Sequence, residues 1–197
     1  MLEIAPVTLS GKIVRLEPLS LAHVPDLTVA GNDESIWQYM LYGRVIGEAA
    51  MRAWVEDMLA RQARGSDLPF AVIHLASGRA IGATRYLEIR HAHHGLEIGG
   101  TWYAVEYQRT AVNTECKYLL LRHAFETLGC IRVQFKTDAR NERSQRAIER
   151  LGAVREGLFR NHMILSDGVV RHSVYYSIVA EEWPTVKARL EQKLGRH

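Results

Sequence analysis

The segment from residue 96 to residue 128 limits the possible folds more than any other part of the chain. Leu96–Tyr103 has a strand-like apolar pattern, and its adjacent glycines, Gly99 and Gly100, indicate a bulge or a close backbone approach. A short polar loop then leads into Thr114–Leu128, whose apolar residues recur at helical spacing. A strand that passes through a short loop into a long helix is typical of folds in which helices cover a sheet.

The rest of the chain alternates between helix and strand patterns. We predict further strands over residues 12–16, 69–76, 80–89, 131–137, 154–165 and 169–179, and further helices over 20–30, 47–64, 141–151 and 185–197. The last helix is basic and is expected to be solvated. Because no repeat or linker divides the chain, the sequence predicts a single α/β (α+β) domain over residues 1–197, built around a mixed sheet.

Composition narrows the classes of function. The chain has 197 residues with 25 basic and 22 acidic side chains, so its net charge of +3 is small, and the charges are interspersed. We therefore expect no specific nucleic-acid partner, although an anionic cofactor in one pocket would fit. No apolar run approaches the ~20 residues of a membrane span, and the N-terminus resembles no signal peptide. The two cysteines make neither a disulfide framework nor a zinc motif. We expect a cytoplasmic protein with no membrane partner and no metal.

The junction between Trp102 and Thr114 is a candidate anion site. The first backbone N–H groups of a helix have no acceptor inside the helix, and the helix dipole places partial positive charge there. Inward-turned amides in the preceding loop add donors, and Arg109 adds a full charge. A pyrophosphate is the ligand that this combination favours.

The same loop resembles the coenzyme A loop of the GNAT acetyltransferase superfamily. Members carry Gln/Arg-x-x-Gly-x-Gly/Ala at this strand-to-helix junction, and this chain has Gln108-Arg109-Thr110-Ala111-Val112-Asn113. The longer run EYQRTAVNTE is very similar to the RimJ/RimL-like subgroup, which is related to ribosomal-protein N-terminal acetyltransferases. That subgroup usually has glycine where this chain has Ala111. Alanine there would cost on the order of 1 kcal/mol if its φ is positive, and little if φ is negative.

A second block, Asn141 to Gly152, resembles the family's Asn-x-x-Ser/Ala…Glu-Lys/Arg-Leu-Gly segment. The resemblance implies that Asn141 hydrogen-bonds the pantetheine arm of coenzyme A and that Ser144 lies near its sulfur. Many members have tyrosine, the acid for the departing thiolate, where this chain has Ile148. Protonation would then come from Ser144, from water or from no group, because a free thiolate is an acceptable leaving group near neutral pH.

Together the two blocks imply the GNAT fold over about residues 12–183 and acetyl-CoA as the cofactor. That fold is a mixed, mostly antiparallel, twisted sheet, expected here with about seven strands and four to five helices, in which the fourth and fifth strands splay apart to admit the pantetheine arm. The cofactor-binding residues implied are Trp102, Tyr103, Ala104, Gln108, Arg109, Thr110, Ala111, Val112, Asn113, Thr114, Asn141, Arg143 and Ser144.

Acyl transfer to an amine also needs a base and an acceptor site. Glu97, on the strand before the loop, is the first candidate for the base, acting directly or through a water, with a pKa raised by partial burial. Ser144 is the second catalytic candidate. Alternatively, Glu97 is a solvent-facing residue paired with Arg85 or Arg90. By analogy with the family, the mouth of the acceptor site is lined by Trp37, Tyr39 and Tyr42.

The reaction expected is N-acetyl transfer to a primary amine by direct attack in a ternary complex. The acceptor is a protein or peptide N-terminus or a small-molecule amine, and the protein is a possible homodimer. The alternative is a CoA-binding sensor or structural protein with weak or lost catalysis. Asn141 can also be only a helix cap, and Ser144 an ordinary first-turn serine.

Overall fold

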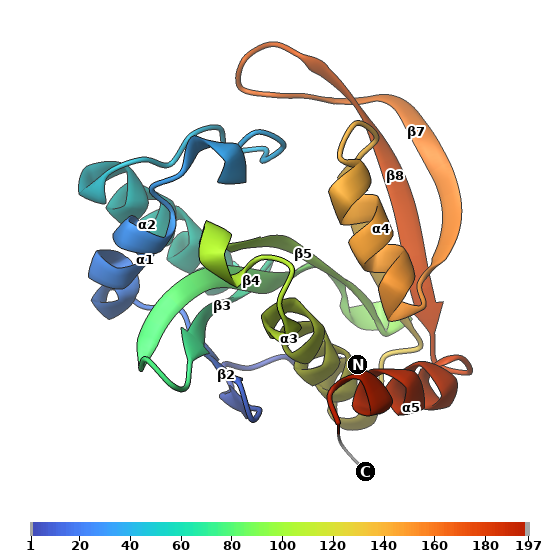
Figure 1. The fold of residues 1–197 in the computed structure, drawn as a ribbon. Helices are drawn as coiled ribbons and strands as arrows, with labels where there is room; N and C mark the ends of the chain where they lie inside the picture. The colour runs from blue at the N-terminus through green and yellow to red at the C-terminus, as the bar shows by residue number, and fades with distance from the viewer. Residues whose placement is uncertain (1, 196–197) are drawn as a thin grey trace.

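The computed structural model describes residues 2–195 (Figure 1). Its strands are β1 (Leu9–Ser10), β2 (Val14–Pro18), β3 (Leu68–His74), β4 (Arg79–Arg90), β5 (Gly95–Tyr103), β6 (Arg132–Asp138), β7 (Val154–Ile164) and β8 (Val170–Val179). Its α-helices are α1 (Val24–Ala30), α2 (Glu48–Ala63), α3 (Ala111–Arg122), α4 (Glu142–Leu151) and α5 (Trp183–Lys193). The predicted order of elements is confirmed, and within the described residues no helix is long and apolar enough to cross a membrane.

All eight strands form one sheet in the order β1-β2-β3-β4-β5-β6-β8-β7. Every neighbouring pair is antiparallel except β5 and β6, which are parallel and joined by α3. The mixed, mostly antiparallel sheet is therefore confirmed. The strand that the sequence did not predict is β1, which is too short to show a pattern and pairs with β2 through Leu9 and Leu16.

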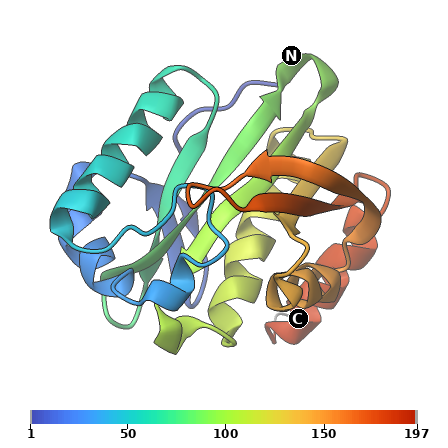
Figure 2. The ribbon, with the colours of Figure 1, turned by 90° about the horizontal axis from the view of Figure 1, so that it is seen from above.

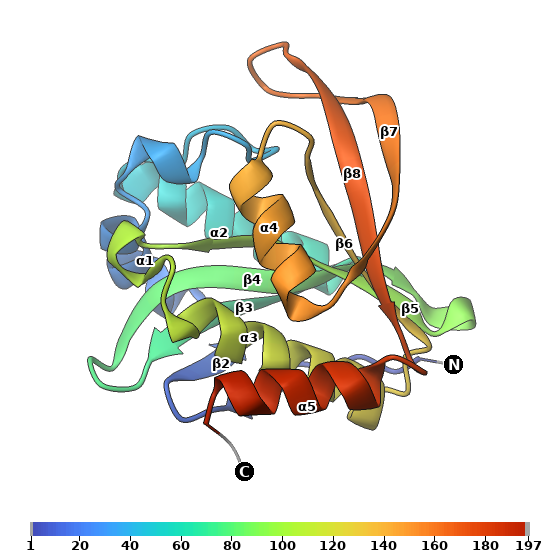
Figure 3. The same cartoon turned by 45° about the vertical axis from the view of Figure 1, so that its right-hand side comes forward.

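Helices cover both faces of this sheet (Figure 3). On one face, α1 and α2 pack against Ala71 and Ile73 of β3, whereas Phe70 and Val72 of the same strand join the core beneath α3 and α5. Strand β3 is thus buried on both faces, which explains its continuous apolar run. The sheet provides a rigid support between two hydrophobic cores.

The C-terminal helix corrects one prediction. We expected a solvated helix over 185–197, but α5 lies against α3 and buries Trp183, Val186 and Leu190. These residues recur at intervals of three and four, so they form an apolar stripe on an otherwise basic helix. Residues 196 and 197 of the predicted helix lie outside the described residues.

The parallel pairing of β5 and β6 stops early. Gly95, Leu96 and Glu97 pair with Arg132, Val133 and Gln134, and the register ends there although both strands continue. The sequence analysis counted these two strands as the fourth and fifth. They are the fifth and sixth strands of the structure because the unpredicted β1 precedes them. Beyond the last pair, α4 and the β7–β8 hairpin lie on the β6 side, and the hairpin's tip approaches the segment between α1 and α2 (Figures 1 and 2). The sheet is splayed where the resemblance requires it.

Candidate active site

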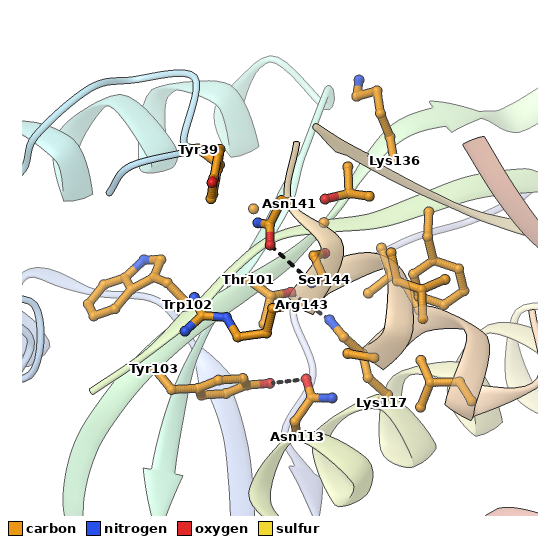
Figure 4. A pocket seen from close by; sticks show the side chains of 18 of the residues that line it. Tyr39, Thr101, Trp102, Tyr103, Asn113, Lys117, Lys136, Asn141, Arg143 and Ser144 are labelled. Carbon is orange, nitrogen blue, oxygen red and sulfur yellow. Dashed lines mark hydrogen bonds between the residues drawn. The ribbon is translucent and has the colours of Figure 1, made fainter. Parts of the chain in front are cut away.

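A cavity of about 760 Å³ occupies the region where β5 and β6 part. Its walls come from β5, β6, the start of α3, α4 and the segment around residues 36–42 (Figure 4). This volume lies within the range of sites that bind small molecules and cofactors, which is about 300–1,000 Å³. The cavity brings Asn113 of the first sequence block and Asn141 and Ser144 of the second together with Glu97 of β5.

Glu97 lies at the last paired position of β5, and only 2% of its surface is exposed. Its Oε2 accepts a hydrogen bond of 2.9 Å from Gln134 Nε2, and its Oε1 lies 3.6 Å from Lys136 Nζ. Burial raises the pKa of the Glu97 carboxyl, and the nearby Lys136 charge and the Gln134 hydrogen bond oppose that effect. The alternative of a solvent-facing ion pair with Arg85 or Arg90 is wrong, because Glu97 is buried and Arg85 pairs with Asp67.

Strand β5 contains the bulge that its glycines predicted. In the pairing of β4 with β5, Ala83 faces Trp102 and Arg85 faces Gly99, so two residues of β5 oppose the single Thr84 between them. Gly100 has φ +56°, which glycine adopts at little cost. The bulge lies next to the parted edge, where the backbone of Trp102 to Ala104 was expected to meet the pantetheine arm.

The start of α3 forms the end of the cavity predicted to bind an anion. Thr110 is the N-cap: its Oγ1 accepts from the Val112 N–H at 3.3 Å and donates to the Tyr107 carbonyl at 2.7 Å. Thr110 and Ala111 are exposed, and the first turn contains no acidic residue. The helix begins three residues before the predicted Thr114, so half of the predicted loop is its first turn. Apart from the Val112 N–H, which Thr110 caps, the first amides of the helix have no acceptor within the helix and remain suited to a diphosphate.

The position of Ala111 in the structure shows why alanine is tolerated where the family usually has glycine. Ala111 is the first residue of α3 and has ordinary helical geometry, whereas the positive φ of this loop, +61°, belongs to Arg109. Alanine at the first helical position requires no left-handed backbone, so the substitution costs little. The departure from the family pattern therefore leaves the loop intact.

Helix α4 supplies the opposite wall. Asn141 is its N-cap, with Oδ1 accepting from the Ser144 N–H at 3.0 Å, so the capping interpretation is confirmed. The cap uses only the carbonyl oxygen, and the side-chain NH2 group remains a donor suited to a ligand. Arg143 Nη1 donates to Gln108 Oε1 at 2.7 Å, and Gln108 Nε2 donates to the Tyr103 carbonyl at 3.1 Å. Gln108 thus links the two walls of the cavity.

The aromatic residues predicted for the acceptor mouth separate into two groups. Tyr39 and Tyr42 line the cavity, and the Tyr42 hydroxyl donates to the Gly100 carbonyl at 3.4 Å. Trp37 is buried and packs against Trp102 with ring centroids 5.0 Å apart. It supports the wall from behind and does not reach the mouth.

Sequence reasoning missed several polar residues of the cavity. Lys117, Gln134 and Arg171 are buried and Lys136 is half-buried, and each either lines the cavity or contacts a residue that does. The signal for Lys117 was its place within an apolar helix, next to Cys116 and three residues before Leu120. The partners of Glu97 depend on the parallel register of β6, which no local pattern reveals.

Both cysteines are buried. Burial raises the pKa of the Cys116 thiol and raises the pKa of Cys130 to about 11, so neither thiol is activated as a nucleophile. Among residues 2–195, no three side chains of the types that bind metals gather into one site.

The parted parallel strands, the exposed helix start and the buried carboxylate form the arrangement that the resemblance implies for an acyltransferase that binds a diphosphate-containing thioester. Comparison with protein families agrees. The model of the acetyltransferase (GNAT) domain matches residues 14–154, and the chain therefore belongs to the GNAT acetyltransferase family. The protein is an acetyl-transferring enzyme, and its acyl donor is acetyl-CoA.

Individual relatives are consistent with this assignment. An acetyltransferase structure from T. thermophilus is 42% identical, with TM-score 0.89, over 98% of this chain and 99% of that chain. A GCN5-related N-acetyltransferase from Brucella melitensis is 28% identical, with TM-score 0.90, over 96% of this chain and 86% of that chain. YdaF of Bacillus subtilis, assigned as a ribosomal N-acetyltransferase, is 33% identical over 84 residues, which are 43% of this chain and 45% of YdaF. The match thus spans less than half of YdaF, and it agrees with the RimJ/RimL-like resemblance.

Proposed function

We propose that the protein acetylates a primary amine by direct attack of the amine on acetyl-CoA in a ternary complex. The observation that supports this most strongly is the buried Glu97 at the point where β5 and β6 separate. A carboxylate at that point lies between the expected path of the pantetheine arm and the acceptor side, lined by Tyr39 and Tyr42.

We assign different parts of the cofactor to different residues around the cavity. The diphosphate is assigned to the amides and side chains of residues 108–114, because the first N–H groups of a helix have no acceptor within the helix and Arg109 adds a positive charge. Asn141, Arg143 and Ser144 face the same cavity from α4. Bound acetyl-CoA supplies an activated acetyl group, and the backbone of Trp102 to Ala104 would fix its orientation.

Glu97 is assigned as the base. An amine attacks only when neutral, and most primary amines are protonated near neutral pH, so a proton must leave before or during attack. A carboxylate whose pKa is raised by burial is a better proton acceptor than an ordinary surface glutamate. Gln134 and Lys136 hold its two oxygens, so the carboxylate has a fixed orientation.

A protein or peptide N-terminus is the preferred acceptor, in keeping with the assignment of YdaF, and a small-molecule amine is the other class to test. The experiment supplies acetyl-CoA with a panel containing peptides with free N-termini, amino acids and polyamines, and follows release of free CoA thiol. Products are identified by mass. We expect thiol release that requires an amine and matches the acetylated product in amount.

Tight CoA binding without turnover on the whole panel would contradict this proposal and would favour a CoA sensor. The homodimeric state and the cytoplasmic location stay predictions.

A further inference from the structure

Lys117 is a buried amine on the cavity side of α3, and neither sequence block assigns it a role. Only 6% of its surface is exposed, and it lines the same cavity as Asn113 and Ser144. Its Nζ donates to Thr101 Oγ1 at 2.5 Å (Figure 4). Thr101 Oγ1 in turn lies 2.7 Å from Thr84 Oγ1. The amine thus points at β5 beside the bulge at Gly100.

The buried Lys117 ammonium has no ion-pair partner among residues 2–195, because none of the carboxylates described there pairs with it. The groups around it are the Thr101 hydroxyl of β5, which is in turn bonded to the Thr84 hydroxyl of β4, and the Cys116 thiol on its own helix. Arg143 and Ser144 line the same cavity from α4. A buried ammonium without an anion is costly, so such a group is usually retained for a ligand.

The chemistry of the cavity lacks a strong proton donor where the family has one. Ile148 replaces the tyrosine, and the Ser144 hydroxyl is a weak acid. We propose, on the basis of the acetyl-transfer function above, that the Lys117 ammonium is the proton donor to the sulfur of the departing coenzyme A. This assigns a catalytic role to a residue on α3, where the family pattern points to α4.

Bonds and protons balance in this step. The amine nitrogen forms a bond to the acetyl carbon while the carbon–sulfur bond breaks, and the electron pair of that bond goes to sulfur. Glu97 accepts the proton that the attacking nitrogen loses, and Lys117 Nζ gives one proton to sulfur. After CoA leaves as the thiol, Lys117 takes a proton from solvent and Glu97 releases one, so the enzyme returns to its starting state.

The acidity of Lys117 suits this task. Burial lowers the pKa of its ammonium to about 8, close to the ~8.5 of an ordinary thiol. Proton transfer between groups of similar pKa, near the working pH, is efficient in both directions. An exposed lysine, with a pKa of ~10.4, would be a poorer donor. The burial that makes the ammonium costly is also what makes it a usable acid.

The primary test measures the thiol of bound CoA, without acceptor or turnover. Thiolate absorbs in the ultraviolet, so titration of the CoA complex against pH gives the pKa of the bound thiol. For the wild type we expect that pKa to be lower than that of free CoA by about one unit or more, because a neighbouring ammonium favours the thiolate. Lys117→Met should remove this shift, and Lys12→Met, the same change at an exposed lysine outside the cavity, should leave it unchanged.

Kinetics with an accepted amine provide the second readout. Lys117→Met should lower kcat by about 100-fold near neutral pH. A general acid works in its protonated form, so wild-type kcat should fall as the pH rises through about 8, and the variant should lack this descending limb. Lys117→Arg keeps the charge but does not release a proton. The pKa of the bound CoA thiol should therefore stay lowered in this variant, and kcat should fall.

The proposal would be overturned if the pKa of the CoA thiol were the same in the wild-type complex as in free CoA, or if Lys117→Met lowered that pKa as much as the wild type does. So would stoichiometric acetylation of Lys117 by acetyl-CoA, detected by mass, because the amine would then be a nucleophile. CoA affinity and the far-ultraviolet spectrum of each variant show whether the site is folded. A failed amine panel with an intact Lys117-dependent thiol shift would reject the acceptor chemistry alone, so the two failures are distinguishable.

Discussion

Glu97 and Glu115 are both buried carboxylates, 2% and 1% exposed, but their surroundings differ. Glu115, on α3, accepts from three successive backbone N–H groups, those of Lys12, Ile13 and Val14, at 2.9, 2.6 and 2.7 Å. A Cβ at Gly11 would collide with the same carboxylate, so glycine permits this close approach. Glu97 is held by side chains from β6 and faces a cavity.

The difference shows that burial alone does not mark a catalytic acid. The amides around Glu115 form a small anion-binding nest that the protein fills with its own side chain, which ties α3 to the β1–β2 turn. At the start of the same helix Thr110 caps the Val112 N–H, and the other first-turn amides, which have no acceptor within the helix, are assigned to the cofactor in the function proposed above. One helix therefore carries a structural anion site at Glu115 and, in the function proposed above, the cofactor site at residues 110–113.

The largest expected effect is on catalysis at Glu97. Glu97→Gln keeps the shape of the side chain and removes the base, so kcat should fall by roughly 10²- to 10⁴-fold. Thermal unfolding should show little loss of stability, because an amide is easier to bury than a carboxylate. Glu181→Gln, at an exposed position, is the matched control. A kcat within about threefold of the wild type, roughly 0.6 kcal/mol, would remove Glu97 from the mechanism.

The second-largest expected effect is a loss of stability when Glu115 is replaced. Glu115→Ala leaves three backbone donors without their carboxylate and should lower the free energy of unfolding by about 3–5 kcal/mol. Urea titration measures this loss. The activity of the fraction that stays folded should change little, because Glu115 does not line the cavity. If Glu115→Ala instead kept its stability and lost kcat, the contrast between the two carboxylates would fail.

A smaller effect on CoA affinity distinguishes the two roles of Asn141, as a helix cap and as a ligand of the cofactor. Asn141→Ser retains a capping oxygen but lacks the NH2 donor, so stability should be kept while CoA affinity falls roughly 3- to 10-fold. Asn141→Ala should lose similar affinity and also about 1 kcal/mol of stability. Calorimetric titration with CoA and urea unfolding give the two numbers. Equal affinity in all three proteins would show that Asn141 is a cap and nothing more.

The smallest effect is the pH dependence of stability that Glu97 contributes. Because its folded-state pKa is raised, the folded protein keeps a proton that the unfolded chain has released. Glu97 therefore weakens folding as the pH rises from the ordinary value of 4.5 through the raised pKa. In the same interval wild-type kcat should rise, because the base must be ionised. Glu97→Gln should lack both trends, which urea titrations and rates at several pH values would show.

The sequence predicted the parts of this protein that depend on local pattern. The α3 helix, the β3 strand, the bulge at Gly100 and the Asn141 cap all follow from periodicity or from the conformational preference of one residue. The resemblance of two blocks then led to the family, which the domain match confirms. Glu97 was selected by its place on the strand that precedes the cofactor loop.

What sequence reasoning missed depends on contacts between distant segments. Gln134 meets Glu97 only because β5 and β6 pair in one parallel register. Lys117 became notable only when the structure showed its burial without an ion pair among residues 2–195. The solvated C-terminal helix was wrong because charge was given more weight than the spacing of Trp183, Val186 and Leu190. The cost of Ala111 could be settled only by locating the first residue of α3.

A crystal structure of the protein with CoA is the most direct test of the central claim, that the opening between β5 and β6 receives the cofactor. We expect the diphosphate to lie against the amides of residues 110–113 and the pantetheine arm to lie along Trp102–Ala104, with the sulfur within reach of Lys117. A cofactor bound elsewhere, with β5 and β6 closed upon each other beyond Glu97, would contradict it.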